Sequence, residues 1–382
     1  FEIREAHPIG LYSQKVRITP SIRKQSAWSN IEFTWDDAEQ TLLPILEIFK
    51  KLMHSTSELV ELIPEEDEEL YSAISNLHNR LNELYENLHA LVFEPLSERI
   101  YWIEATPNSG SLSLHTAPLH IGRLMQKHLW YEKKSIILTS ATLTTGGEFN
   151  YLRNRLAADD ANELALGTPF DYETSTLLYL VEDIPEPSDR YGYQRFVETA
   201  LIQICQAVGG KTLALFTSYD QLRKTSQSIS SILANHEIMV YEQGEGASPH
   251  SLLESFRHSE KAILLGTRAF WEGVDVPGQA LSVLAIVKLP FDVPTDPIIS
   301  ARAETYEEPF YQYSLPEAIL RFRQGFGRLI RTQSDRGVVV ILDKRIMSKR
   351  YGPLFIESLP QCTIKIGPLS DAPRLVSQWL NL

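Results

Sequence analysis

Three arginines and a glutamine recur at helical spacing in the stretch RFRQGFGRLIR, residues 321–331. The members of this stripe are Arg321, Gln324, Arg328 and Arg331. They are three, four and three residues apart, so on a continuous helix they would share one face. A guanidinium stays charged at any working pH, and its planar fork matches phosphate oxygens. Gly325 and Gly327 weaken a helix here and suggest that another group approaches the backbone closely. A solvated face is the alternative, but a phosphate ligand is favoured.

Hydroxyl groups follow two apolar, strand-like runs. LALFTSY carries Thr217 and Ser218 just before its last residue, Tyr219. SIILTSATL, which we interpret as a buried strand, carries Ser140 and Thr142 near its end. Open parallel sheets bind ligands at the carboxyl ends of their strands. We therefore expect the first pair to offer hydrogen bonds to a phosphodiester. The second pair is either part of a site or a cap for the next helix.

A third run, LLGTRAFWEGVDVPG at 264–278, places Thr267 and Arg268 directly after an apolar strand and Glu272 and Asp275 in the loop beyond. Carboxylates beside an aromatic pair in such a loop are typical of site residues. Asp275 could instead only shape its turn.

The segment QAVGGKT at 206–212 imitates the end of a phosphate-binding loop. The first glycine of G-x-x-x-x-G-K-[ST] would fall at Cys205, and the order is helix, loop, strand rather than strand, loop, helix. We predict that Gly209 and Gly210 end a helix. Cys205 and Cys362 are too few to make a disulfide framework, a zinc site or an iron–sulfur site by themselves.

The elements that must position these residues can be predicted as well. Ser314, Pro316 and Glu317 form a capping-box pattern at the start of the arginine helix. From Leu177 onward, continuous apolar runs alternate with amphipathic helical ones. The strand-like runs are LLYLV, TLALF, IMVY, AILLG, LSVLAIV and GVVVILD. Such alternation predicts a doubly wound α/β domain whose parallel sheet is covered on both faces.

The net charge of −13 comes almost entirely from one segment. Residues 32–94 hold fifteen acids against three bases, whereas the remaining 34 acids and 33 bases nearly cancel. Apolar residues in this segment repeat every three or four positions in two arms, which predicts an antiparallel helical hairpin over about 41–92. Pro44 places the start of its first helix near Thr41. The hairpin is either an arm that touches a partner or a solvated insertion.

No run of about 18 apolar residues and no signal peptide is visible, so a soluble cytoplasmic protein without a membrane partner is the default. The chain starts at Phe1 rather than Met, from which we expect a piece of a longer protein.

In this order, TSATL, LFTSY, GTRAFWEGVDVPG and QGFGRLIRTQSDRGVVVILDKR resemble the later motifs of superfamily 2 DNA helicases of the DinG and XPD group, most closely DinG. The resemblance implies a RecA-like fold in three parts. Residues 1–100 would be the helical arch insertion, 101–168 the C-terminal part of the first motor domain, and 169–382 the second motor domain.

The resemblance also implies roles. Arg328 and Arg331 would stabilise charge on the phosphates of ATP, with Gln324, Arg321, Glu272 and Asp275 lining the same cleft. Ser140 and Thr142 would couple ATP hydrolysis to movement on DNA. Single-stranded DNA would contact Thr217, Ser218, Thr267 and Arg268, with 5′ to 3′ polarity. DNA junctions are expected partners, and repair or replication the expected setting.

The sequence departs from the family because it shows no Walker A loop, intact DEAH box or iron–sulfur cysteines. The sites for ATP and Mg²⁺ would then lie mostly upstream, and this chain alone would be inactive. One alternative is a DinG-like exonuclease with a degenerate motor; another is a non-catalytic nucleic-acid-binding module. The DNA structure, the pathway, an upstream iron–sulfur cluster and the oligomeric state are left open.

Overall fold

A computed structural model describes residues 14–59, 66–106, 111–244, 246–271 and 281–382. Its contacts divide the chain into two compact units, Phe1–Ile121 with Val293–Thr305, and Gly122–Asp292 with Tyr306–Leu382. Across the described ranges, no helix combines the length and the apolar character that crossing a membrane requires.

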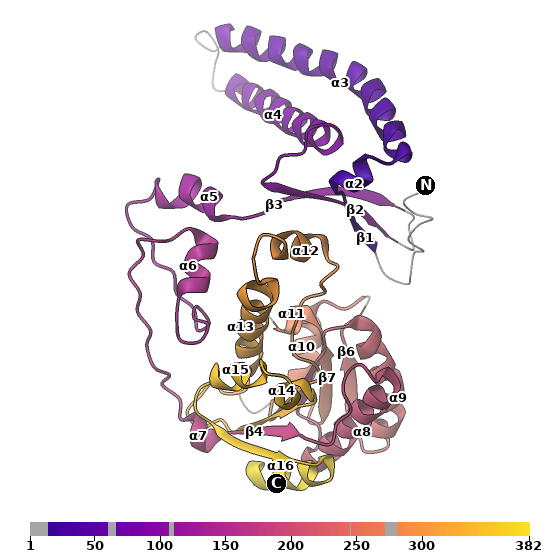
Figure 1. Ribbon diagram of the computed structural model, residues 1–382, viewed down its shortest axis with the longest axis vertical. Coiled ribbons are helices and arrows are strands. Elements are labelled where there is room, and N and C mark those ends of the chain that lie inside the picture. Colours follow the sequence, from indigo (N-terminus) through magenta and orange to yellow (C-terminus); the bar gives the residue numbers. More distant parts are fainter. Residues whose placement is uncertain (1–13, 60–65, 107–110, 245, 272–280) are drawn as a thin grey trace. The chain divides into compact units, whose positions relative to one another are not determined.

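The first unit contains a helical hairpin whose arms, α3 (Ser26–Leu59) and α4 (Glu66–Val92), lie side by side (Figure 1). The predicted start near Thr41 is wrong, because α3 begins fifteen residues earlier and keeps Pro44 inside it. A proline inside a helix costs about 3 kcal/mol. Trp28 and Trp35, which are 2% and 7% exposed, pack with the end of α4. Burying two such side chains stabilises the earlier turns enough to offset that cost.

The same unit holds a three-stranded antiparallel sheet in the order β1-β2-β3. The strands are β1 (Gln14–Arg17), β2 (Arg99–Ala105) and β3 (Leu112–Pro118), and the short helix α2 (Pro20–Arg23) follows β1. Helix α12 (Pro297–Ala303) packs Ala301 against Ile100 and Trp102 of β2. Residues 293–305 therefore belong with the N-terminal unit, although they come late in the sequence.

The second unit is built on a seven-stranded sheet with the order β10-β4-β9-β8-β5-β7-β6. All of its neighbouring pairs are parallel. The strands are β4 (Thr176–Val181), β5 (Thr212–Leu215), β6 (Met239–Glu242), β7 (Ala262–Gly266), β8 (Val283–Ile286), β9 (Gly337–Ile341) and β10 (Thr363–Gly367). The predicted α/β, doubly wound parallel sheet is confirmed.

Helices cover both faces of this sheet (Figure 1). Alternate strand residues explain why: Val339 and Ile341 of β9 enter one core, and Val338 and Val340 enter the other. One core includes residues of α10 (Pro249–His258), α11 (Arg268–Trp271), α13 (Leu315–Phe326), α14 (Arg345–Ser348) and α15 (Gly352–Glu357). The opposite core includes residues of α8 (Arg190–Val208), α9 (Tyr219–Ala234) and α16 (Ala372–Leu380).

The remaining elements are short. They are α5 (Gly122–Met125), the π-helix η2 (Gln126–Trp130), α6 (Asn150–Leu156), α7 (Tyr172–Ser175), the π-helix η4 (Phe310–Ser314) and the 3₁₀ helix η5 (Leu369–Asp371). The interpretation of QAVGGKT as a helix end is confirmed, since α8 stops at Gly209 in the left-handed conformation at φ 67°.

Candidate functional site

The carboxyl ends of β5 and β7 bring two predicted pairs to one edge of the sheet, because these strands are parallel neighbours. Thr217 and Ser218 follow β5, and Ser218 caps α9 by accepting a hydrogen bond at Oγ from the Gln221 N–H at 3.4 Å. Thr267 follows β7 and is only 3% exposed. Arg268, the first residue of α11, is exposed at the same edge. The Ser218 hydroxyl thus orients a helix whose N-terminus faces this edge.

Gln243, at the end of β6, was not predicted from the sequence. Its Oε1 accepts hydrogen bonds from the Thr267 N–H at 2.7 Å and the Thr267 hydroxyl at 2.9 Å. Its Nε2 donates to the Tyr219 hydroxyl at 2.8 Å. Gln243 therefore joins the loop after β7 to the start of α9. Its place after the strand-like run IMVY and Glu242 was the available signal.

The arginine stretch does not lie on one helix, contrary to the sequence prediction. Helix α13 ends at Phe326, so only Arg321 and Gln324 of the stripe are helical. Gly327 caps the helix, and the Arg328 N–H then donates to the Gly325 carbonyl in a turn at 3.2 Å. Glycine lowers helix propensity by about 1 kcal/mol, and two of them end the helix before the stripe is complete.

Gly325 does meet a close neighbour, as predicted, but that neighbour is part of the protein. A Cβ at this position would lie 2.9 Å from two ring carbons of Trp271. The Trp271 indole is buried and donates from Nε1 to the Phe216 carbonyl at 3.0 Å. The glycine therefore lets α13 pack against α11.

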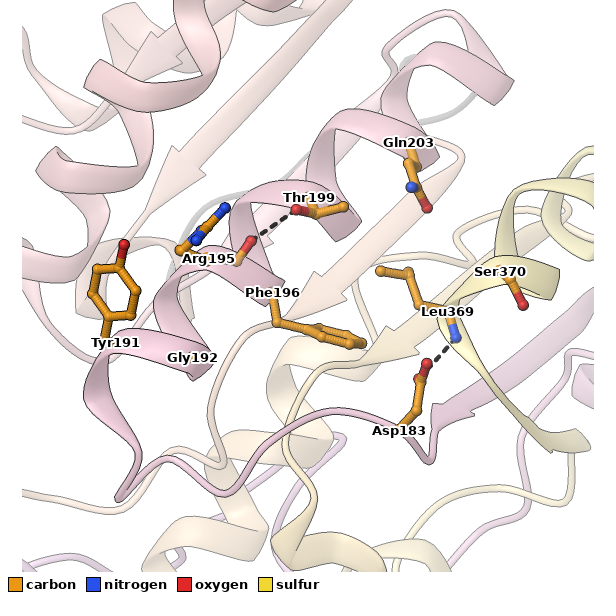
Figure 2. A pocket seen from close by; sticks show the side chains of 9 residues that line it. All are labelled: Asp183, Tyr191, Gly192, Arg195, Phe196, Thr199, Gln203, Leu369 and Ser370. Carbon is orange, nitrogen blue, oxygen red and sulfur yellow. Dashed lines mark hydrogen bonds between the residues drawn. The ribbon is translucent and has the colours of Figure 1, made fainter.

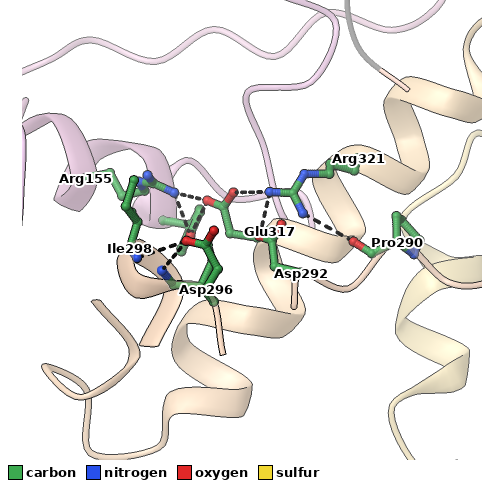
Figure 3. A network of polar contacts seen from close by, with 9 residues as sticks. Arg155, Pro290, Asp292, Asp296, Ile298, Glu317 and Arg321 are labelled. Carbon is green, nitrogen blue, oxygen red and sulfur yellow. Dashed lines mark hydrogen bonds and ion pairs between the residues drawn. The ribbon is translucent and has the colours of Figure 1, made fainter. Parts of the chain in front are cut away.

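The predicted capping box at Ser314 and Glu317 is wrong. Ser314 has helical dihedrals and makes no capping hydrogen bond, because η4 runs directly into α13. Glu317 instead enters a half-buried polar network (Figure 3). Its Oε1 accepts from the Tyr151 hydroxyl at 2.5 Å and from the Arg155 guanidinium. Burial, followed by the Glu317 charge, raises the pKa of Tyr151.

Arg321 belongs to the same network (Figure 3). Its Nη2 lies 2.7 Å from Asp292 Oδ2 and 3.5 Å from Glu317 Oε2, and its Nη1 donates to the Pro290 carbonyl at 3.3 Å. The Arg321 side chain is only 12% exposed. Its guanidinium is thus engaged by the loop after β8 and by its own helix.

The segment 135–143 is not the buried strand that the sequence suggested. Residues 135–140 have no regular secondary structure, and Ile137 is 86% exposed. A strand needs a hydrogen-bonded neighbour, and none of the described strands pairs with this segment. Ser140 and Thr142 form a local turn, in which the Thr142 N–H donates to Ser140 Oγ at 3.2 Å.

Helix α13 contacts this segment through two adjacent side chains. Gln324 Nε2 donates to Thr142 Oγ1 at 3.3 Å, so two predicted site residues are brought together. Arg323 Nη1 donates to the Thr144 carbonyl and, at 3.1 Å, to Thr144 Oγ1. Burial lowers the pKa of the Arg323 guanidinium. Arg323 was missed because it falls off the stripe of the other arginines.

Arg328 and Arg331 lie beyond the helix end in different surroundings. Arg328 is 6% exposed and donates from Nη2 to the Trp271 carbonyl at 2.8 Å. Arg331 is exposed, and its N–H and that of Thr332 donate to Asp335 Oδ2 at 2.8 Å each. Burial acts to raise the pKa of Asp335, but these hydrogen bonds outweigh it and hold that pKa below its ordinary value. Glu272 and Asp275 lie outside the described residues.

A hollow of about 520 Å³ opens between α8 and η5, near the end of β4 (Figure 2). Asp183 Oδ1 accepts from the Leu369 N–H at 2.8 Å on its wall, and Arg195 stacks over the Tyr191 ring at 5.7 Å. No predicted site residue lines it. Among the residues with described positions, no group of three histidines, cysteines, aspartates or glutamates could hold a metal ion.

Comparison with known proteins identifies the family. The helicase C-terminal domain family matches residues 201–362. The chain is 32% identical over 372 residues to the 3′-5′ exonuclease DinG of Bacillus subtilis, covering 93% of this chain and 40% of that protein. It is 36% identical over 264 residues to the ATP-dependent DNA helicase YoaA of Escherichia coli, covering 68% and 40%. The chain belongs to the DinG-type group of superfamily 2 helicases.

The DinG-type assignment extends across most of the chain, but the chain spans about half or less of the length of these relatives. The ATP-dependent DNA helicase YoaA of Haemophilus influenzae is 32% identical over 87% of this chain and 51% of its own length. A solved XPD helicase structure matches with a TM-score of 0.51 at 17% identity, over 80% of this chain and 56% of that one. That likeness supports the RecA-like fold.

Proposed function

We propose that this DinG-type chain supplies the second motor domain of an ATP-dependent DNA helicase that moves along single-stranded DNA. The observation that carries the proposal is the contact between Gln324 and Thr142. Gln324 stands on the arginine helix, and Thr142 belongs to the segment for which family resemblance implies coupling. A change in nucleotide state that moves Gln324 would therefore be transmitted directly to Thr142.

In this proposal the arginine stretch acts on the phosphates of ATP. Arg328 is fixed by the Trp271 carbonyl, which holds its guanidinium in one orientation before the reaction. Arg331 presents an exposed guanidinium from a turn braced by Asp335. Gln324 Oε1 is buried without a hydrogen-bond donor among the described residues, so it can accept one from a bound molecule. Mg²⁺, when bound, would neutralise phosphate charge; the described residues offer no carboxylate cluster for it.

The DNA track in this proposal follows the carboxyl edge of the sheet. Ser218 caps α9, so the N–H groups of that helix start are directed to the edge, where phosphodiester oxygens are suitable acceptors. Arg268 adds an exposed positive charge on the neighbouring strand end. Movement from 5′ to 3′ and action on DNA junctions remain part of the proposal. So do the arch at 1–100, the first-motor segment at 101–168 and the second motor domain at 169–382.

The Bacillus subtilis relative is named a 3′-5′ exonuclease, which favours a second candidate function, an exonuclease in which this region only binds DNA. The two candidates differ in what Arg328 does. In a motor, Arg328→Ala in the full-length protein should lower kcat for DNA-stimulated ATP hydrolysis by about 10³-fold or more. Arg328→Lys should restore little of this kcat, because the ammonium of lysine is a point charge and does not reproduce the planar fork of the guanidinium.

Arg350→Ala is the matched control, since Arg350 is an exposed arginine in the same unit. Its turnover should equal that of the wild type. Turnover unchanged in Arg328→Ala would remove Arg328 from the ATP site. Release of nucleotides from a 3′-labelled strand without any DNA-stimulated ATP hydrolysis would favour the exonuclease.

A further inference from the structure

Lys288 lies at the carboxyl end of β8, near the middle of the seven-stranded sheet, between β9 and β5. Leu215 of β5 pairs with Ile286 of β8, so Thr217 and Lys288 each stand two residues beyond a paired position. Lys288 therefore shares the ligand-binding edge of the sheet with Thr217 and Ser218. The resemblance to DinG-type helicases assigned it no role.

The Lys288 ammonium is held over an aromatic ring. Its Nζ lies 5.1 Å from the centroid of the Tyr193 ring. The single proton of the Tyr193 hydroxyl is shared between the carbonyls of Val287 and, at 2.9 Å, Leu342. These bonds fix the ring between the ends of β8 and β9. The ring in turn fixes the lysine at the edge without consuming its hydrogen-bonding capacity.

The charges around Lys288 are mostly positive. Within the described part of the chain, no carboxylate forms an ion pair with its half-buried side chain. Burial, then the charge of Arg345, lowers the pKa of Lys288, and Arg190 acts in the same direction. Asp343 opposes this shift but is 1% exposed. Asp343 already accepts from Arg345 Nη2 at 2.6 Å and from the Leu289 N–H at 2.9 Å.

A half-buried cation between like charges destabilises the protein unless an anion joins it. Outside the acidic segment 32–94 the acids and bases nearly cancel, so a local positive excess here is specific to this site and indicates a negatively charged ligand. Arg190, exposed at the first turn of α8, would reach the same ligand from outside. The site thus combines one half-buried and one exposed cation.

The position of the ring distinguishes DNA from ATP as the source of that anion. Tyr193 belongs to the core on the α8 side of the sheet. Phe322 and Phe326 of the arginine helix belong to the core on the opposite side. The Lys288 ammonium therefore lies over the α8 face of the sheet, opposite the core that holds the arginine helix.

We propose that Lys288 and Arg190 form a phosphodiester contact that continues the DNA track from the end of β5 across the end of β8. This inference rests on the proposed function, because it assumes that the carboxyl edge binds single-stranded DNA. The contact is to the backbone rather than to bases, so it should be independent of DNA sequence.

The test is the salt dependence of single-stranded DNA binding by the full-length protein. Fluorescence anisotropy with a labelled oligothymidylate, and with a mixed-sequence strand, should be compared for the wild type and Lys288→Gln. One lost phosphate contact lowers the slope of log Kobs against log salt by about 0.7, or about fivefold in affinity at 0.1 M salt. Lys288→Arg should restore the slope, and Lys365→Gln, an exposed lysine on the edge strand β10, should leave it unchanged.

Arg190→Gln gives a second measurement that does not disturb a buried group, and it should lower the slope in the same direction. If wild-type protein binds but Lys288→Gln and Arg190→Gln keep its slope, this inference is refuted while the DNA-binding proposal stands. If wild-type protein itself fails to bind single-stranded DNA, the proposed function fails first. A slope change on one DNA sequence alone would contradict a backbone contact.

Discussion

Glu317→Gln is expected to loosen the helix that carries the arginine stretch. The substitution keeps the shape and leaves an acceptor for Tyr151, but it removes the negative charge between Arg155 and Arg321. The Glu317 and Arg155 side chains are 18% and 24% exposed, so solvent screening is limited. At an effective dielectric constant of about 20, the attraction across the 3.5 Å to Arg321 is roughly 5 kcal/mol before desolvation. Arg321 retains Asp292, whereas Arg155 loses its carboxylate partner.

The net cost should be about 3 kcal/mol, at the low end for breaking a buried ion pair. A local measurement suits a chain of two units, because a single unfolding free energy is poorly defined there. Native-state hydrogen exchange of peptides covering α13 should therefore speed up by roughly 10²-fold.

Glu307→Gln is the control, because Glu307 is an exposed glutamate that precedes the same helix. Arg155→Met in the Glu317→Gln background should add less than about 1 kcal/mol, since the partners act as one unit. The network does not hold α13 if the α13 amides of Glu317→Gln exchange at a rate within threefold of the rates in the wild type and in Glu307→Gln.

Two further perturbations test the end of the arginine helix. Gly325→Ala places a methyl group 2.9 Å from the Trp271 ring and should cost about 1–3 kcal/mol in the local stability that native-state hydrogen exchange of α13 reports. Gly327→Ala, whose new Cβ would lie 3.4 Å from the Arg323 carbonyl oxygen, should stay within about 0.5 kcal/mol, and equal costs would contradict the packing argument. The pKa of Asp335 is lower in the folded protein than its ordinary value of about 3.9, so the ionised carboxylate stabilises the fold at pH values above about 3.9. This stabilisation is lost as the pH falls through the lower native pKa. Asp335→Asn should therefore cost about 1 kcal/mol at pH 7, and a cost that does not shrink as the carboxyl group of the native protein is protonated in acid would refute this assignment.

The parallel sheet could be predicted because each of its buried strands is a continuous apolar run that can be recognised separately in the sequence. Every residue of β4, β5, β7, β8 and β9 is buried, and the corresponding apolar runs have no polar alternation to obscure them. The left-handed helix end at Gly209 is equally local, since its conformation depends on one glycine. The extent of α3 was missed because the burial of Trp28 on α4 is a tertiary effect.

The arginine stretch shows why site residues are harder to predict than strands. Helical periodicity groups residues by angle, but tertiary partners decide what each guanidinium does. Arg321 lies on the predicted stripe and forms an ion pair with Asp292. Arg323 lies off the stripe and donates a hydrogen bond to Thr144. Neither partner has a fixed sequence distance from the helix. A sequence pattern of three and four residues therefore cannot assign these two roles.

Gly325 and Gly327 divide the arginine stretch into a helical part and a part beyond the helix end, and the arginines of the two parts have different partners. Gly325 admits the Trp271 ring, and the helix then ends at Gly327, so Arg328 turns back toward the Trp271 carbonyl. Had the helix continued, Arg328 would have shared a face with Arg321. The helix end instead separates Arg321, which Asp292 and Pro290 hold, from Arg328, which the Trp271 carbonyl holds. Arg331, farther along, is exposed. A single glycine-to-alanine change at 325 should consequently disturb Arg328 more than Arg321, which is fixed independently by Asp292 and Pro290.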